Sequence, residues 1–412
     1  MTAARAWSAR PFRWVWAASG LSLLGSEIGD LAIPLLALLT LDASPGEIAS
    51  LRLAQFAPFL LLTLAFGVLV DRMGRRRLMI TADLGRGLVL LTVAAAVLWW
   101  TLPVGWLVVA AFALGTLTVL YQLADFSFLP QVVPREALAD ANAKLSATQS
   151  AMSLAGNGAG GVAVQVLTAP FAILATAGSY LLSALLLRRV RVDDPAPVAE
   201  AGQPRGAWRQ TREGIEFLVR DRVLRALAGE AGTWNLFNEI LLLGLTLHVV
   251  RTFEYGAAAL GGLLMVAGLG GFLGAWLSGH ATRRFGYGRS LVATLAVGNT
   301  IPLALGLAQD GSVAALLLYA VVLTTSGFAV GLANAQAVTV RQLITPAPLR
   351  GRVNGAYRFV SWGMVAVGAS LAGVVTTVWG PFAAILVGAA GTTVATLWIV
   401  FSPIPSLRDL TE

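Results

Sequence analysis

The sequence contains no cysteine, two histidines and, in Lys144, a single lysine among its 412 residues. Without cysteine the chain forms no disulfide and no thiolate metal site, and two scattered histidines do not make a histidine-rich metal centre. We therefore expect no bound metal and no cofactor. Charge is scarce as well: 12% of the residues are charged, against roughly 25% in soluble proteins. So few charges cannot cover the surface of a soluble protein, and the composition predicts a membrane protein.

Apolar stretches fill most of the chain, with 57% hydrophobic residues and 44 glycines. A helix needs about 20 residues to cross a bilayer, so about twelve spans fit into this length. Runs between charges, prolines and glycines predict spans near residues 12–41, 48–70, 78–100, 104–128, 144–168 and 171–189. A second set is predicted near residues 222–250, 256–281, 290–309, 312–340, 355–378 and 381–402.

Basic residues are concentrated in alternate connections between these spans. Of 29 basic residues, 26 lie in the two terminal segments or near residues 72–77, 135–144, 188–225, 283–289 and 341–358. The positive-inside rule therefore places both termini in the cytoplasm, for a multi-pass protein of the plasma membrane. Because this pattern explains the net charge of +8, we expect no nucleic-acid partner.

The longest connection divides the chain into three predicted parts. These are an N-terminal six-helix bundle at 1–190, a cytoplasmic linker at 191–221 and a C-terminal six-helix bundle at 222–412. The linker begins with a stretch rich in Pro, Gly and Ala. Its second part places Trp208, Ile215 and other apolar residues among arginines and acids, which suggests a short amphipathic helix on the inner leaflet.

A shift of 212 residues aligns the two halves of the chain. The aligned pairs include Glu27 with Glu239, Pro134 with Pro346, Asn142 with Asn354 and Gly156 with Gly368. Equal numbers of spans in the same orientation imply parallel repeats related by an axis along the membrane normal. Such repeats enclose a site near the membrane midplane and expose it alternately to the two sides.

The connection after the second span reads GVLVDRMGRRR at residues 67–77. It resembles the Gly-x-x-x-Asp-Arg-x-Gly-Arg-Arg motif between helices 2 and 3 of the major facilitator superfamily and matches every specified position. The resemblance implies an all-α membrane protein with twelve transmembrane helices in two six-helix bundles. It also implies a secondary transporter rather than an enzyme. A positive-inside anchor without further function is the alternative interpretation of the motif. The resemblance assigns a cytoplasmic gate to Gly67, Asp71, Arg72, Gly74, Arg75 and Arg76.

Other segments narrow the resemblance to a branch of the superfamily. The stretches SLRLAQFAPFLLLTLAFGVLVDR and ITPAPLRGRVNGAYRFVSWG are similar to the branch that includes enterobactin exporters and macrolide-efflux proteins. Residues 156–161 read GNGAGG, similar to the Gly-Pro-x-x-Gly-Gly motif of antiporters, with Asn157 in place of proline. The motif, through Gly156, Gly160 and Gly161, indicates export; a small-residue face for close helix packing is an equally open interpretation. The arginine that many proton-coupled drug antiporters carry in helix 4 is absent from residues 104–128.

Acidic residues at membrane depth mark the candidate site, because a charge there is costly and usually faces a cavity, a partner or a proton path. Glu27 and Asp30 lie one turn apart in the first span, and Ser19, Ser22 and Ser26 extend a polar stripe from them. The repeat places Glu239 of the seventh span opposite Glu27, and helices 1 and 7 line the cavity in the superfamily. The predicted site for proton coupling and substrate comprises Glu27, Asp30, Asn235, Asn238 and Glu239. Alternatively, these acids only bond to neighbouring helices or to Arg52.

Further charges within the spans indicate structural roles. Asp83 and Arg86, three residues apart, predict an ion pair that supports the Asp71 loop, and Asp125 is a candidate for the same network. Arg52 has Asp30 and Glu47 as possible partners.

The sequence therefore predicts a secondary active transporter that exports small amphipathic compounds, drugs or metabolites, by proton antiport. We expect a monomer whose partners are a small-molecule substrate, protons and the lipid bilayer. The alternative is a dedicated exporter of a siderophore or self-made metabolite with a narrow, anionic substrate range. In that case Arg52, Arg86 and Arg358 would face the cavity.

Overall fold

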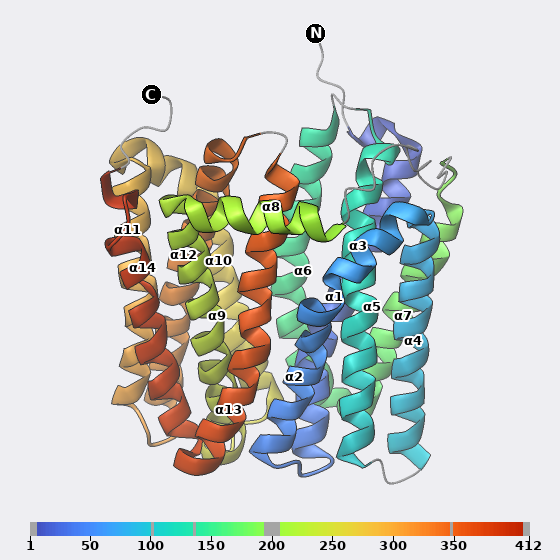
Figure 1. The fold of residues 1–412 in the computed structure, drawn as a ribbon. Coiled ribbons are helices and arrows are strands. Elements are labelled where there is room, and N and C mark those ends of the chain that lie inside the picture. Colours follow the sequence, from blue (N-terminus) through green and yellow to red (C-terminus); the bar gives the residue numbers. More distant parts are fainter. Residues whose placement is uncertain (1–5, 100–102, 135–136, 193–206, 347–348, 407–412) are drawn as a thin grey trace. The chain divides into compact units, whose positions relative to one another are not determined.

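The computed structural model describes residues 6–99, 103–134, 137–192, 207–346 and 349–406. A few side chains within helices, among them those of Asp71, Asn142 and Asn157, lie outside this description. The described residues are α-helical with short 3-10 and π segments, and they include no strand (Figure 1).

The chain forms two compact units, one of Met1–Ala43 with Ala57–Ala207 and one of Ser44–Phe56 with Trp208–Glu412. The first part of α2 thus belongs to the second unit. The helices in the first half of the chain are α1 (Arg10–Leu39), α2 (Pro45–Leu61), α3 (Thr63–Arg72), α4 (Arg75–Trp99), α5 (Val104–Val132), α6 (Leu138–Leu167) and α7 (Ala169–Arg189). Those of the second half are α8 (Ala207–Arg220), α9 (Arg222–Leu247), α10 (Ala257–Phe285), α11 (Tyr287–Thr300), α12 (Val313–Ile344), α13 (Arg350–Ala395) and α14 (Leu397–Val400). Shorter segments are η1 (Ala6–Ser8), η3 (His248–Thr252), η4 (Ile301–Leu307) and η6 (Ile404–Ser406).

Nine segments of the described chain are long and apolar enough to cross a membrane. One of them, Arg352–Val400, includes most of α13. If straight, α13 would measure about 70 Å, more than twice the roughly 30 Å hydrocarbon core of a bilayer. Helix α13 is kinked at Gly380, where φ is 87°, and Pro381 follows. The helix therefore covers two of the predicted spans. The remaining two predicted spans correspond to α2 with α3 and to α6. The prediction of an all-α, multi-pass fold is confirmed.

In the first unit, α1 packs against α6 and α7, and α4 packs against α5 and α7. Its apolar core includes Phe12, Met79, Phe128 and Leu187, all fully buried. In the second unit, α9 packs along α13, and α10 packs along α12.

Glycines set the distance between α10 and α12. A Cβ built at Gly274 would lie 1.9 Å from the carbonyl oxygen of Phe328, and one built at Gly331 would lie 2.0 Å from that of Gly271. The two backbones therefore touch, as in the small-xxx-small contacts of membrane helices. This packing gives the glycine-rich run of α10 a structural role.

The repeat of 212 residues is visible in this packing. A Cβ built at Gly156 of α6 would lie 2.4 Å from the Cβ of Glu27 in α1. A Cβ built at Gly368 of α13 would lie 2.4 Å from the carbonyl oxygen of Leu236 in α9. Each half of the chain therefore uses the same glycine to bring its first and fifth spans together.

The second part of the predicted linker forms α8, while residues 193–206 lie outside the described residues. This helix runs across α13 (Figure 1), and a Cβ at Gly214 would lie 2.5 Å from the carbonyl oxygen of Arg352. Arg352 also pairs with Glu213 at 2.5 Å, and Leu218 is buried in an apolar cluster with α9 and α13. Ile215, by contrast, is exposed. The amphipathic segment is thus packed onto the second unit.

We predict that Gly274→Ala lowers the melting temperature of the purified protein, because its Cβ would overlap the α12 backbone. Overpacking of this kind costs about 1–3 kcal/mol. Gly262→Ala, in the same helix, is the matched control, since a Cβ there would meet no described atom within 4 Å. Equal melting temperatures for the two variants would contradict the close α10–α12 contact.

Candidate functional site

Glu27 lies in the middle of α1 and faces α6. Its side chain is half-buried and accepts a hydrogen bond from Ser153 of α6. Gly156, one turn further along α6, leaves room for the Cβ of Glu27, and Gly160 contacts the backbone of Ile28. The glycines of the antiporter-like motif therefore form the surface against which Glu27 is held. Gly161 is buried in the same helix, and the Asn157 side chain lies outside the described residues.

Asp30 follows Glu27 by one turn of α1. Its side chain is exposed and lies close enough to Glu27 for the two carboxylates to interact electrostatically. Since like charges at this spacing repel each other, the ionisation of one acid disfavours that of the other. The pair is thus suited to holding a proton.

The serines of the polar stripe in α1 form hydrogen bonds to other helices. Ser19 and Ser22 are each 2% exposed. Ser19 donates a hydrogen bond to Asp125 at 3.1 Å, and Ser22 donates one to Asp83 at 3.2 Å. These hydroxyls bind carboxylates of α4 and α5.

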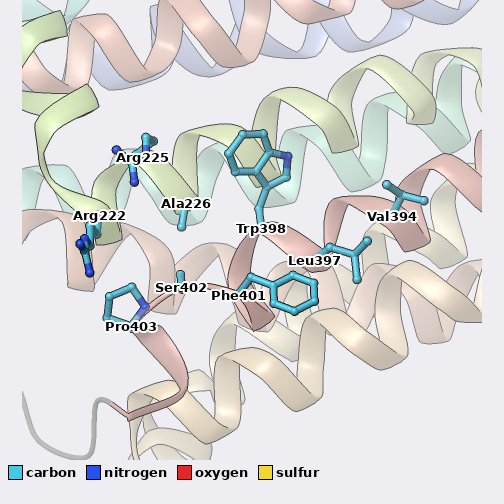
Figure 2. A pocket seen from close by; sticks show the side chains of 9 residues that line it. All are labelled: Arg222, Arg225, Ala226, Val394, Leu397, Trp398, Phe401, Ser402 and Pro403. Atoms are coloured by element: carbon cyan, nitrogen blue, oxygen red, sulfur yellow. The ribbon is translucent and has the colours of Figure 1, made fainter.

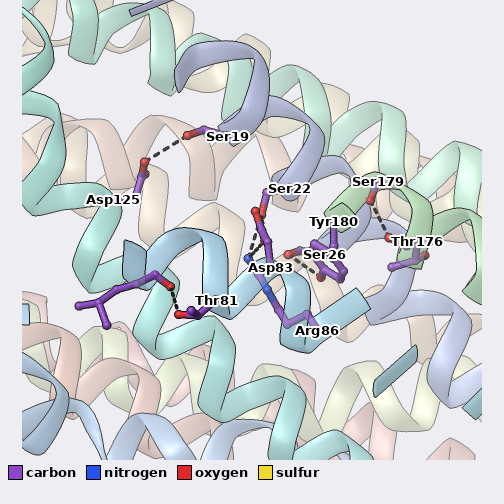
Figure 3. A network of polar contacts seen from close by, with 11 residues as sticks. Ser19, Ser22, Ser26, Thr81, Asp83, Arg86, Asp125, Thr176, Ser179 and Tyr180 are labelled. Carbon is purple, nitrogen blue, oxygen red and sulfur yellow. Dashed lines mark hydrogen bonds and ion pairs between the residues drawn. The ribbon is translucent and has the colours of Figure 1, made fainter. Parts of the chain in front are cut away.

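Arg86 is the centre of this buried network, which Figure 3 shows. Its Nη2 donates to Asp83 and, at 3.0 Å, to the Ser22 hydroxyl. The guanidinium lies over the rings of Tyr121 and Tyr180, 4.6 Å and 4.3 Å from their centroids. The Arg86 guanidinium therefore has partners in four helices, α1, α4, α5 and α7.

The network explains why the ion pair is tolerated inside the first unit. Taking two charges out of water costs several kcal/mol per ion, and close pairing with further polar partners is needed to offset this cost. The side chains of Arg86 and Asp83 are 2% and 0% exposed. Arg86 is therefore enclosed within the first unit as the partner of Asp83.

Arg52 forms the second ion pair within the spans, and its partner is Glu239 of α9. Its Nε lies 2.6 Å from Oε1 and its Nη2 lies 3.2 Å from Oε2, a two-point contact. Arg52 also lies over the ring of Phe56, 4.9 Å from the centroid. Glu239 is 5% exposed, so its charge is balanced within the second unit.

Glu47, one of the expected partners of Arg52, has a different role. Its carboxylate accepts hydrogen bonds from the backbone N–H and the hydroxyl of Ser44, and the Ser44 hydroxyl accepts from the Glu47 N–H. This reciprocal arrangement is a capping box, which satisfies the first N–H groups of α2.

A cavity of about 220 Å³ lies inside the second unit. Glu230 and Asn235 line it from α9, and Asn299 lines it from α11. The Asn299 amide donates to Glu230 at 3.3 Å and to Thr396 at 3.1 Å, while its Oδ1 has no partner among the described residues. The aromatic walls are Trp234, Tyr357 and Trp362.

The predicted residues of α9 are thus divided between two environments. Asn235 lines the cavity with Glu230, whereas Glu239 belongs to the ion pair with Arg52; Asn238 is half-buried and is not among the cavity residues. Sequence reasoning did not identify Asn299 or the aromatic walls, although an asparagine at membrane depth is a usable signal.

The predicted gate lies where α3 ends at Arg72 and α4 begins at Arg75. Arg76 donates to the carbonyl oxygens of Leu187 and Arg188, at 2.8 Å and 2.6 Å, and so caps the end of α7. Among the described residues no atom lies within 4 Å of a Cβ built at Gly67. The Asp71 side chain lies outside the described residues, Arg72 is exposed, and Gly74 and Arg75 are half-buried.

The described residues contain no group of three or more histidine, aspartate and glutamate side chains that could hold a metal. Instead, the units combine membrane-length helices, buried acids and an internal polar cavity. This combination defines a polytopic membrane protein with polar sites inside its helical units.

The sequence profile of the Major Facilitator Superfamily matches residues 15–369. The chain belongs to this superfamily. It is 27% identical over 404 residues to the multidrug efflux pump Tap of Mycolicibacterium fortuitum, covering 94% of this chain and 93% of Tap. It is 26% identical over 351 residues to YfiS of Bacillus subtilis (strain 168), an uncharacterised transporter of the same type, covering 82% and 80%.

Solved structures show the same fold. The nucleoside transporter NupG is similar with a TM-score of 0.77 at 10% identity, over 95% of this chain and 99% of that one. A bacterial homologue of the iron transporter ferroportin gives a TM-score of 0.71 at 16% identity, over 95% and 98%. The major facilitator fold predicted from the sequence is confirmed, and the protein is a membrane transporter.

We predict that Arg86→Met destabilises the protein strongly, since it leaves the buried Asp83 carboxylate without its counter-charge. Loss of one partner of a buried pair costs about 3–5 kcal/mol. The double variant Asp83→Asn with Arg86→Met should recover much of this loss. The measurement is thermal unfolding in detergent, and a double variant no more stable than Arg86→Met would contradict the pairing.

Proposed function

We propose that the protein is a proton-coupled exporter of small amphipathic compounds, such as drugs or metabolites, that works by alternating access. It resides in the plasma membrane as a monomer with both termini in the cytoplasm. The six-helix bundles at 1–190 and 222–412 are its two moving bodies. The similarity to Tap, named a multidrug efflux pump, over nearly the whole chain supports export.

The observation that carries the proposal is the environment of Glu27. This acid lies mid-span, is half-buried, and has Asp30 one turn away and a single hydroxyl donor in Ser153. Asp83 and Glu239, by comparison, each have an arginine. An acid at membrane depth to which the described residues supply no basic counter-charge is suited to bind and release a proton. We assign proton coupling to Glu27, with Asp30 as the neighbour that modulates its charge.

The second unit contributes the proposed substrate contacts. The cavity with Glu230 presents one carboxylate, the amides of Asn235, Asn299 and Asn334 and several aromatic rings, and none of the described residues that line it is basic. Aromatic faces and a carboxylate attract neutral and cationic amphipathic groups. This lining supports a broad range of small, uncharged or cationic substrates.

A narrow exporter of an anionic siderophore is less well supported. Two of the three arginines that this alternative requires already have carboxylate partners: Arg86 pairs with Asp83, and Arg52 pairs with Glu239. Their positive charges are neutralised, so neither offers a free site for an anion in this structure.

We propose that Gly67, Asp71, Arg72, Gly74, Arg75 and Arg76 form the cytoplasmic gate. The bonds of Arg76 to the end of α7 support this role, because they tie the loop between α3 and α4 to the first unit. The loop would then move with that unit during the cycle.

Glu27→Gln should abolish substrate efflux driven by a pH gradient in proteoliposomes, since an amide cannot exchange a proton. Substrate binding to the purified variant should persist, because the amide keeps the size and hydrogen bonding of the side chain. Glu216→Gln, an exposed position of α8, is the matched control and should transport normally. Unchanged gradient-driven efflux in Glu27→Gln would remove Glu27 from the mechanism.

Asp71→Asn should slow the transport cycle at least several-fold while leaving substrate affinity nearly unchanged, because a gate residue contacts no substrate. Efflux rates and equilibrium binding on the same preparation check this. A loss of binding with normal rates at saturation would place Asp71 in the substrate site instead.

A further inference from the structure

A pocket of about 680 Å³ opens beside the first turns of α9, where the chain enters this helix from α8. Figure 2 shows two arginines at one end of the pocket and apolar side chains along the rest of it. Its walls include Arg222 and Arg225 of α9 and Leu397, Trp398 and Phe401 from the end of the chain. All of these residues belong to the second unit.

Trp398 is held in place by α9. A Cβ at Gly229 would lie 2.6 Å from Cδ2 of the indole, so the absence of a side chain at Gly229 lets the ring pack directly against α9. The indole N–H donates to the Thr233 hydroxyl at 3.0 Å. Arg225, Gly229 and Thr233 are spaced four residues apart and lie on one face of the helix. The same face therefore positions the basic end and the aromatic wall of the pocket.

The basic end of the pocket has no acidic partner in the described structure. Arg222 is exposed and forms no ion pair there, and Arg225 donates to the carbonyl oxygen of Val219 at 3.1 Å. Asp221, the adjacent acid, caps α9 by accepting from the N–H groups of Val223 and Leu224 at 3.0 Å and 2.8 Å. Both positive charges also lie in the first turn of a long helix, whose dipole favours an anion.

The apolar wall faces away from the unit. Phe401 is 84% exposed, Leu397 is 47% exposed and Trp398 is 46% exposed. In a chain that spans the membrane, such a surface contacts acyl chains. A small inorganic anion would leave this wall unused, whereas a lipid would cover it and also supply a phosphate to the arginines.

We propose that this pocket binds an anionic phospholipid, with its phosphate between Arg222 and Arg225 and an acyl chain along Leu397, Trp398 and Phe401. The site is independent of the transported substrate, since it lies outside the cavity that contains Glu230. It would fix the junction of α8 and α9 to one leaflet.

The test uses the full chain in neutral detergent and phosphatidylglycerol with a brominated acyl chain, which quenches nearby tryptophan fluorescence. The native protein should show saturable quenching, and Trp398→Phe should remove part of its amplitude without changing the apparent affinity. Arg222→Gln with Arg225→Gln should weaken binding about tenfold or more. Arg283→Gln with Arg284→Gln, exposed in the last turn of α10, removes the same charge elsewhere and should have little effect.

Three results would overturn the proposal. One is equal quenching by brominated phosphatidylcholine, which would show that charge is not recognised. Another is an equal loss of affinity in the two double variants, which would indicate a general surface effect. The third is competition by millimolar inorganic phosphate together with undiminished quenching in Trp398→Phe, which would indicate a free-phosphate site. The first and third results use folded native protein or a conservative variant, so they hold even if the double variants fail to fold.

Discussion

The hydrocarbon core of a bilayer offers no partner to a polar group, and the interior of both units is arranged around this constraint. Arg86 shows it most clearly. Its guanidinium takes partners from four helices, and the hydroxyls of α1 are used for the same purpose. Because these partners come from different helices, the network constrains the rotation of α1 relative to α4 and α5. Charge neutralisation thus specifies the packing of the first unit as well as permitting it.

The same constraint separates acids that have a basic partner from acids to which the described residues supply none. Asp83 and Glu239 each have an arginine at hydrogen-bond distance. Among the described residues, Glu27 has one serine donor and a second acid nearby. A carboxylate without a paired arginine can gain or lose a proton at small cost in free energy, whereas a carboxylate in a close ion pair cannot. This difference is the physical basis for assigning proton coupling to α1.

Close packing replaces the hydrophobic effect where helices meet inside the membrane. Lipid tails are as apolar as leucine, so helix contacts depend on shape, and glycine permits the shortest approach. Gly274 and Gly331 bring α10 and α12 into backbone contact, and Gly156 brings α6 against Glu27. The antiporter-like motif of α6 therefore has a packing role in this structure, and the proposed coupling residue depends on it.

The sequence by itself determined the all-α class, the number and approximate ends of the spans, the two-part repeat and the superfamily, because hydropathy, charge position and the motif at 67–77 are local properties of the chain. It also pointed to the charged residues within the spans as candidates for the site. Only the tertiary structure decided their partners: Arg52 meets Glu239, 187 residues away, and Ser22 meets Asp83. Such pairings depend on how each helix is rotated against its neighbours, and this rotation follows from the packing of every side chain at once rather than from spacing along one helix.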